Sequence, residues 1–167
     1  MRMAIYTVSL MRNHIEKAVL LFDVQCNLDK RGIELDSLRC TVCDDALETS
    51  QHLWVDCVVA RNVWDMVCKW WRHDDYPKDL QSLISWAGSN SFPSKMARYF
   101  DVVVQTTFSS IWHYRNKLCF DIKPPRKDTI GDDIKLLSHL WISHRSRNFQ
   151  SCWLDWTIDP VNVCSKL

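Results

Sequence analysis

The chain has 167 residues, the length of one domain with or without an extension. Its 21 Lys and Arg residues nearly balance 20 Asp and Glu residues, and the net charge of +1 excludes a protein that is basic over its whole surface. Any contact with a nucleic acid must therefore come from a local basic patch, because phosphate contacts dominate such binding. Only three Gly and five Pro residues are present, which argues against a many-stranded sheet and favours helices.

The sequence contains no sign of a membrane or export segment. No run of about 18 apolar residues is present, so we expect no transmembrane helix. Near the N-terminus Arg12, His14, Glu16 and Lys17 interrupt any apolar stretch of the kind a signal peptide needs. We therefore expect an intracellular protein, cytoplasmic or nuclear, in which cysteines stay reduced and more often bind metals than form disulfides.

The first half of the chain predicts two helices around a cysteine-rich segment. Apolar residues recur every three or four positions over residues 3–24, which indicates a helix. Gly32 is expected to end helical structure, and the cysteine-rich segment follows. From Thr49 the pattern is again helical. The apolar stripe of this second helix is Val59, Val63, Trp64, Val67 and Trp71.

The second half predicts three more helices. Asp79 is expected to cap a short helix that Gly88 ends, and Ser94 to cap a long helix that Pro124 and Pro125 terminate. The next helix carries Ile130, Ile134, Leu137, Leu140 and Trp141 as its apolar positions. The tail after it shows no sustained period and is expected to be extended or irregular. The fold class predicted is mainly α, a helical bundle with a small Cys-Cys-His-Cys knuckle near the N-terminal third.

The knuckle is the segment CTVCDDALETSQHLWVDC, residues 40–57, with the spacing C-x2-C-x8-H-x4-C. A C-x2-C pair supplies two thiolates from one tight turn, and zinc takes four soft or borderline ligands in a tetrahedron. His52 and Cys57 would lie roughly 140° apart on a regular helix, so we expect a local irregularity before Cys57 or a new helix starting there. Spacing alone leaves three interpretations open: a zinc site, a disulfide or redox pair, and coincidence.

The residues around the knuckle resemble the zinc-binding domain at the C-terminal end of LINE-type (non-LTR) retrotransposon reverse transcriptases, abundant in plant genomes. The shared pattern is N-L-x-x-R-G-I, C-x-x-C, Glu-Thr, H-L-[FW]-x-x-C, a small residue and a tryptophan. Its members are Asn27, Leu28, Arg31, Gly32, Ile33, Cys40, Cys43, Glu48, Thr49, His52, Leu53, Trp54, Cys57, Ala60 and Trp64. Residues 111–120, IWHYRNKLCF, resemble the W-x-x-R-N element near the end of such polyproteins.

This resemblance implies one structural Zn²⁺ per chain, with Cys40, Cys43, His52 and Cys57 as its ligands. It also divides the chain into three parts. Residues 1–25 lack the W-R-L-type segment that normally precedes the pattern, so we expect a helical segment foreign to the family. Residues 26–88 are then the reverse-transcriptase-type zinc-binding domain. Residues 89–167 are a C-terminal helical extension, with two long helices and an irregular tail.

We expect this chain not to be an enzyme. The likeness begins downstream of where a polymerase palm would lie, and the palm needs carboxylates that bind two metal ions. Gly131, Asp132 and Asp133 have the look of a polymerase G-D-D turn, but their register predicts the first turn of a helix. His113, His139 and His144 are expected on helix surfaces, and Cys68 and Cys119 in the core.

The function predicted is a non-catalytic zinc module that assists RNA or DNA binding in a parent polyprotein. Trp54 either stacks on a base or packs in the core beside the metal. Two alternatives remain: a zinc-stabilised module that docks another part of the polymerase, and a transposon remnant with no selected activity. The candidate nucleic-acid contacts are Lys30, Arg31, Arg39, Trp54, Arg61 and Lys69.

Overall fold

The computed structural model describes residues 24–89 and 92–166, and this part of the chain is helical. Its α-helices are α2 (Gln25–Lys30), α3 (Val58–Trp71), α4 (Leu80–Ser89), α5 (Ser94–Phe120), α6 (Ile130–Arg145), α7 (Trp153–Ile158) and α8 (Pro160–Ser165). A π-helical turn, η1 (His52–Asp56), precedes α3, and a 3-10 turn, η2 (Lys127–Thr129), precedes α6. The only β pairing in these residues is one antiparallel bridge between Arg39 and Leu47. The predicted mainly α fold is confirmed, while the helix predicted over 3–24 lies almost wholly outside the described residues.

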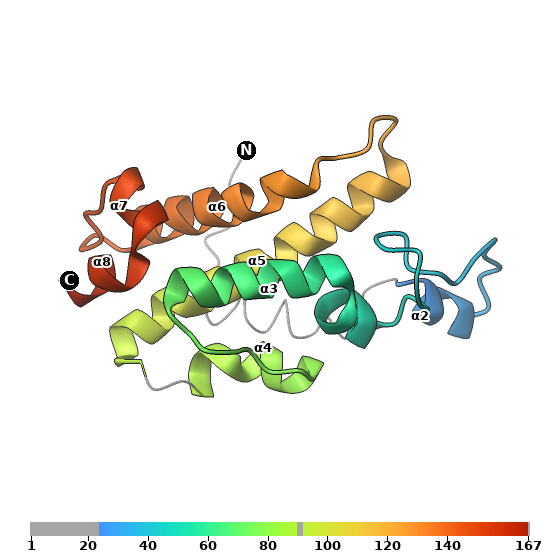
Figure 1. Cartoon of the computed structure of the whole chain (residues 1–167), viewed down its shortest axis with the longest axis horizontal. Helices are drawn as coiled ribbons and strands as arrows, with labels where there is room; N and C mark the ends of the chain where they lie inside the picture. Colours follow the sequence, from blue (N-terminus) through green and yellow to red (C-terminus); the bar gives the residue numbers. More distant parts are fainter. Residues whose placement is uncertain (1–23, 90–91, 167) are drawn as a thin grey trace.

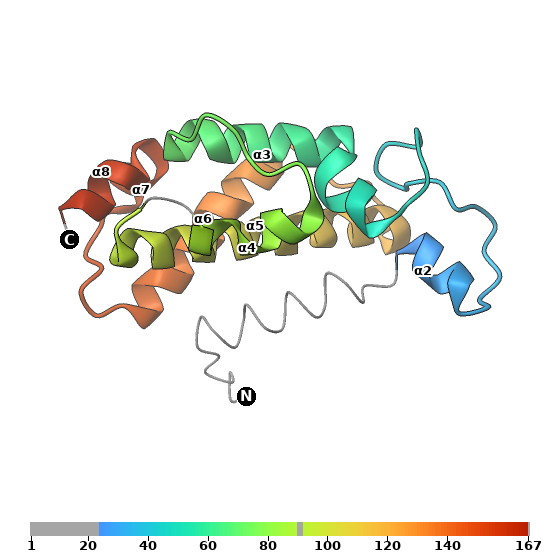
Figure 2. The same cartoon turned by 90° about the horizontal axis from the view of Figure 1, so that it is seen from below.

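The long helix α5 is the spine of the bundle (Figures 1 and 2). It packs against α6, α4, α3 and α8. The knuckle and α2 lie at the end of the molecule where α5 finishes, and the C-terminal helices α7 and α8 lie at the opposite end (Figure 1). In the part of the chain described, none of the helices combines the length and the apolar character needed to cross a bilayer.

Aromatic side chains fill the centre of the bundle. Trp54, Trp64, Trp71 and Trp156 are all fully buried. The ring of Trp71 lies 5.0 Å from that of Phe100 and 5.8 Å from that of Trp156, so one indole joins helices from both halves of the sequence. Each such side chain removes roughly 200 Å2 of surface from water, which makes this cluster the main source of cohesion.

The ends of the helices follow the sequence signals only in part. Gly32 has a φ of +79° just after α2, and Asp79 accepts a hydrogen bond from the amide of Ser82, as predicted for a terminator and a cap. Two predictions were wrong. Pro93, not Ser94, is the N-cap of α5, and α4 continues past Gly88 to Ser89.

The buried face of α6 differs from the face that we predicted. Ile130 and Ile134 are buried, but Leu137 and Leu140 are exposed, and the face continues through Ser138 and Ile142. The buried positions of α6 are therefore four residues apart, whereas the predicted face had spacings of both three and four residues. The Ser138 hydroxyl can be buried because it donates to the carbonyl of Lys135.

The tail predicted as irregular forms two short helices. Cys152 caps α7, and Asp159 caps α8 by accepting a hydrogen bond from the amide of Asn162. Trp156 drives this order, because its fully buried ring lies 5.4 Å from Trp70 and its carbonyl accepts a hydrogen bond from the Trp70 indole. Helices of six residues are too short to show a periodic pattern of apolar residues, so whether they form depends on tertiary packing.

Candidate metal centre

Cys40 and Cys43 lie at the two ends of a tight turn. The amide of Asp44 donates to the carbonyl of Cys40 at 2.7 Å, and Asp44 adopts a positive φ of 53°. The amide of Cys40 donates in turn to the carbonyl of Ala46 at 2.7 Å. These bonds fold the segment back on itself, so the two sulfur atoms face the same side, as a C-x2-C metal turn requires.

The π-helical turn η1 places the other two ligands. The amide of Cys57 donates to the carbonyl of His52 across five residues, at 2.7 Å, and Cys57 then leaves the helical region with ψ of 135°. Cys57 is also the residue from which α3 starts. The predicted irregularity between His52 and Cys57 is therefore confirmed, and single π-helical turns of this kind are frequent at functional sites.

The four side chains converge. One ligand atom from each of Cys40, Cys43, His52 and Cys57 lies within 4.8 Å of all the others, and the Sγ of Cys43 is 3.2 Å from the Nε2 of His52. In a tetrahedral zinc site with Zn–S bonds of ~2.3 Å, the ligand atoms stand about 3.8 Å apart. The cluster needs only small shifts of its side chains to reach this geometry, so the residues fit a zinc ion.

The burial of the cluster suits a closed metal site. Cys40 and Cys57 are buried, and Cys43 and His52 are half-buried. Four protein ligands complete a zinc shell and leave no position for a water molecule, which is the arrangement of structural rather than catalytic zinc.

The two buried thiols, Cys40 and Cys57, share a hydrogen bond. The hydrogen bond with Cys57, and then burial, raises the pKa of Cys40, whereas the hydrogen bond with Cys40 lowers the pKa of Cys57. The backbone amides of Val59 and Ala60, at the start of α3, lower the pKa of Cys57 further. Amides directed at sulfur favour the thiolate, the form that binds a metal ion with release of the proton.

A buried ion pair attaches the knuckle to the bundle, and sequence reasoning did not find it. Glu48 is fully buried, and its Oε1 lies 2.7 Å from the Nη2 of Arg115, which is on α5. The carboxylate also accepts hydrogen bonds from the amides of Gln25 and Thr41. Glu48 belongs to the Glu-Thr of the knuckle pattern and Arg115 to the W-x-x-R-N element. The sequence feature that could have predicted the ion pair was the presence of opposite charges in these two motifs.

Trp54 and Thr49 support the same end of the site. Thr49 accepts a hydrogen bond from the amide of His52 and so orders the start of η1. Of the two roles considered for Trp54, the structure shows core packing: the ring is fully buried, 5.4 Å from Phe108 and 6.0 Å from Trp112. In this conformation Trp54 presents no face on which a base could stack.

The basic residues predicted as nucleic-acid contacts are all exposed, but their surroundings are acidic. The segment 24–57 carries three cationic and seven acidic side chains, a net charge of −4. Arg39 donates to the carbonyl of Asp44 and lies 3.8 Å from its carboxylate. The negative charge of this segment weakens its attraction for phosphate, and the five side chains stay predicted contacts. The five are Lys30, Arg31 and Arg39 beside the knuckle, and Arg61 and Lys69 on α3.

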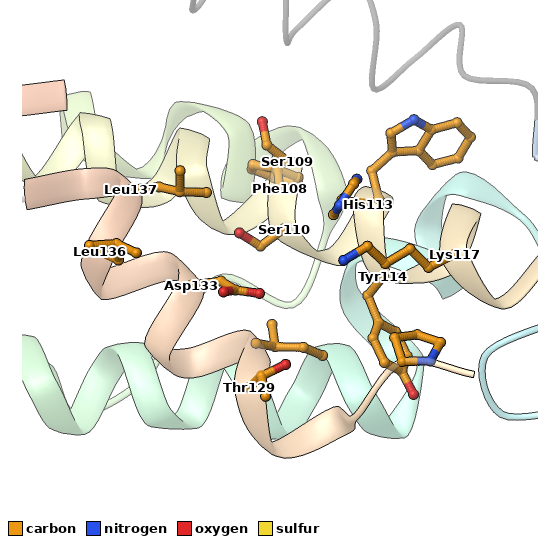
Figure 3. Close-up of a pocket in the computed structure, with 13 residues that line it drawn as sticks. Phe108, Ser109, Ser110, His113, Tyr114, Lys117, Thr129, Asp133, Leu136 and Leu137 are labelled. Carbon is orange, nitrogen blue, oxygen red and sulfur yellow. The ribbon is translucent and has the colours of Figure 1, made fainter. Parts of the chain in front are cut away.

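A separate cavity of about 540 Å3 lies between α5 and α6 (Figure 3). Asp133 approaches it from α6, and His113 and Lys117 approach it from α5. Asp132 and Asp133 lie in the first turn of α6, as predicted, and not in a strand-flanked turn. Asp133 is the one carboxylate among the residues that line this cavity, whereas two-metal chemistry needs several.

The other histidines and cysteines singled out in the sequence lie apart from the metal cluster. Among the described residues, Cys40, Cys43, His52 and Cys57 are the only group arranged to hold a metal ion. His113 is exposed, and His139 is half-buried with its Nε2 near the carbonyl of Ser151. Cys68 is buried as predicted, but Cys119 is only half-buried.

The fold and the cluster define a class: a helical protein with a closed Cys3His site of the zinc-binding type. Residues 6–64 match a family model described as zinc-binding in reverse transcriptase. The matched range includes all four ligands, Glu48 and Trp64, and begins within the segment 1–25 that we expected to be foreign to the family. Searches of curated proteins and of solved structures gave no significant match.

Proposed function

We propose that the chain is a non-catalytic module of a LINE-type retrotransposon reverse transcriptase, of the kind abundant in plants. It holds one structural zinc ion through Cys40, Cys43, His52 and Cys57, and assists RNA or DNA binding in the parent polyprotein. The observation that carries the proposal is the convergence of a Cys3His set within a segment that matches a zinc-binding family of reverse transcriptases.

The zinc ion acts in this proposal as a cross-link between separate pieces of chain. The Cys40–Cys43 turn belongs to an irregular segment with little secondary structure, whereas Cys57 begins α3, whose apolar face is buried in the bundle. Binding a metal across the two fixes the turn against the helix. In small zinc peptides such binding contributes on the order of 10 kcal/mol to folding, and less is expected here because the helices already pack.

Zinc content tests this proposal directly. We would purify the whole chain without added metal and measure zinc per mole by mass spectrometry. The expected result is one zinc per chain, with little in Cys43→Ser and a lower melting temperature for that variant. Cys152→Ser is the matched control: Cys152 is exposed and outside the cluster, and serine can take over its N-cap role on α7, so zinc should be unchanged and stability should not fall. Absence of zinc from the unmodified protein would refute the proposal.

A protein-interaction role is the second candidate, and one surface favours it. Leu136, Leu137 and Leu140 expose their side chains on α6, and the first two line the cavity between α5 and α6. Contact through such a face would be apolar and nearly independent of salt, whereas nucleic-acid binding weakens steeply as salt increases. A salt series of any binding reaction therefore separates the two candidates.

A further inference from the structure

A groove with a strong positive charge lies where α5 begins and α6 ends. Its volume is about 480 Å3. Four of its side chains are cationic, and none of the residues lining it is acidic. We call this surface the basic groove. Its cationic residues are Lys95 and Arg98 on α5, Arg145 at the end of α6, and Arg147 just after it.

The basic groove and the knuckle differ in charge. The ten residues that line the groove include four cationic and no acidic side chains, whereas residues 24–57 carry a net charge of −4. The first turn of α5 adds the partial positive charge of its free amides to the groove. Arg145, in the last turn of α6, offsets the opposite dipole end there. A polyanion is therefore attracted to the basic groove.

The basic groove also contains aromatic side chains. The guanidinium of Arg145 lies 4.2 Å from the ring centroid of Trp141, which is half-buried. The Tyr99 hydroxyl shares a 3.0 Å hydrogen bond with the Oγ of Ser146, which holds the chain leaving α6 against α5. Sites that bind single-stranded nucleic acids combine a positively charged groove, which contacts the phosphates, with aromatic and guanidinium groups on which bases stack. The basic groove contains both kinds of group.

The basic groove is remote from the metal centre. Arg98 and Arg115 are seventeen positions apart on α5, which is roughly 25 Å along a helix rising 1.5 Å per residue. Both views of the bundle place the start of α5 at the end away from the knuckle (Figures 1 and 2). A zinc ion held by the four knuckle ligands would therefore be too distant to contact a phosphate in this groove.

We propose that the basic groove, and not the knuckle, is the surface through which this chain binds single-stranded RNA or DNA. The proposal rests on the nucleic-acid part of the proposed function and names its site. It assigns phosphate contacts to Arg98 and Arg147, both exposed, and assigns stacking on a base to the Arg145–Trp141 pair. Two observations support the proposal: the lining of the groove has four cationic and no acidic side chains, and it lies outside residues 6–64, which match the zinc-binding family.

The test measures binding of the whole zinc-loaded chain to a fluorescent oligouridylate by anisotropy, at several salt concentrations. Arg98→Glu with Arg147→Glu should weaken binding at least about tenfold and reduce the salt slope by about two. Lys30→Glu with Arg61→Glu is the matched control, with the same charge change on exposed residues near the knuckle. Zinc content and circular dichroism should be unchanged in both double variants.

Three results would overturn the inference, and they differ in their consequences for the proposed function. Loss of binding in the control variant alone would move the site to the knuckle and leave the proposed function intact. No binding by the unmodified chain even at low salt would remove the nucleic-acid role altogether, while the zinc measurement would stand. Equal competition by polyglutamate would indicate an acidic protein partner.

Discussion

Glu48 is the residue on which the attachment of the knuckle depends. Its carboxylate is fully buried and is satisfied by the Arg115 guanidinium and by the backbone amides of Gln25 and Thr41. The two oxygens therefore join the backbone at Gln25 and Thr41 to α5, where Arg115 lies 67 positions after Glu48. A buried charge without a counter-charge destabilises the folded state. Removing the charge of either Glu48 or Arg115 therefore destabilises the fold, because the other charge stays buried.

We predict that Glu48→Gln lowers the free energy of unfolding by about 3 to 5 kcal/mol, because it leaves the Arg115 guanidinium buried without its counter-charge. Urea denaturation measures the change. Adding Arg115→Met should restore part of the loss, since the uncompensated charge is then removed. Glu34→Gln, at an exposed position, should have little effect. Equal stability of Glu48→Gln and the unmodified chain would show that the pair is not formed.

His73 makes stability depend on pH. Its ring packs 4.8 Å from Phe92 and 5.0 Å from Phe100, and its Nε2 is buried without a hydrogen-bond partner among the described residues. Burial lowers the pKa of His73 below the ordinary value of 6.5, and nearby Asp74 opposes this in part. The unfolded chain therefore takes up the proton first, so stability is full above pH 6.5 and falls as the pH drops below it.

We predict that His73→Phe flattens this dependence. The unmodified protein should lose more stability than the variant between about pH 7.5 and 5.5, because the variant has no imidazole to protonate. Urea denaturation at each pH gives the two slopes. Protonation of the metal ligands affects both proteins alike, so the difference between the slopes belongs to His73. Parallel slopes would contradict the prediction.

Among the elements, η1 shows how a helical irregularity builds a site. A regular helix would put His52 and Cys57 on different faces, roughly 140° apart. The five-residue bond from Cys57 to His52, followed by extended backbone at Cys57, brings the two side chains together and lets α3 start in its own direction. The same turn buries Leu53, Trp54 and Val55, so core packing stabilises the irregular backbone.

The register of α6 gives a second prediction at this scale. Ile134→Ala should cost about 2 to 5 kcal/mol, because Ile134 is fully buried and its truncation leaves a cavity. Leu137→Ala removes a side chain that is 38% exposed and should cost much less. Thermal or urea unfolding of the two variants compares them. The reverse order would mean that α6 packs with the face that its sequence pattern predicts.

For the whole molecule, the aromatic core connects parts that the sequence separates. We predicted a zinc-binding domain over 26–88 and an extension over 89–167, and this division stays a prediction. In the structure, Trp64 of the first part lies 5.3 Å from Phe108 of the second, and Trp71 contacts both Phe100 and Trp156. The bundle thus fixes the acidic knuckle and the basic groove at opposite ends of one body.

The sequence by itself determined the local features of this protein. The scarcity of glycine and proline predicted helices, the C-x2-C pair predicted a turn, and the five-residue step from His52 to Cys57 predicted an irregular helix start. Each of these features depends on the stereochemistry of a few adjacent residues, so the spacing of residues along the chain is sufficient to predict it.

Only the tertiary structure decided the roles that depend on distant partners. The pairing of Glu48 with Arg115, the burial of Trp54, the face of α6 that packs inward and the order of α7 and α8 all depend on contacts across the bundle. The basic groove likewise combines charges from the start of α5 and the end of α6. Burial and electrostatic attraction act between residues that folding brings together, and spacing along the chain does not record which residues these are.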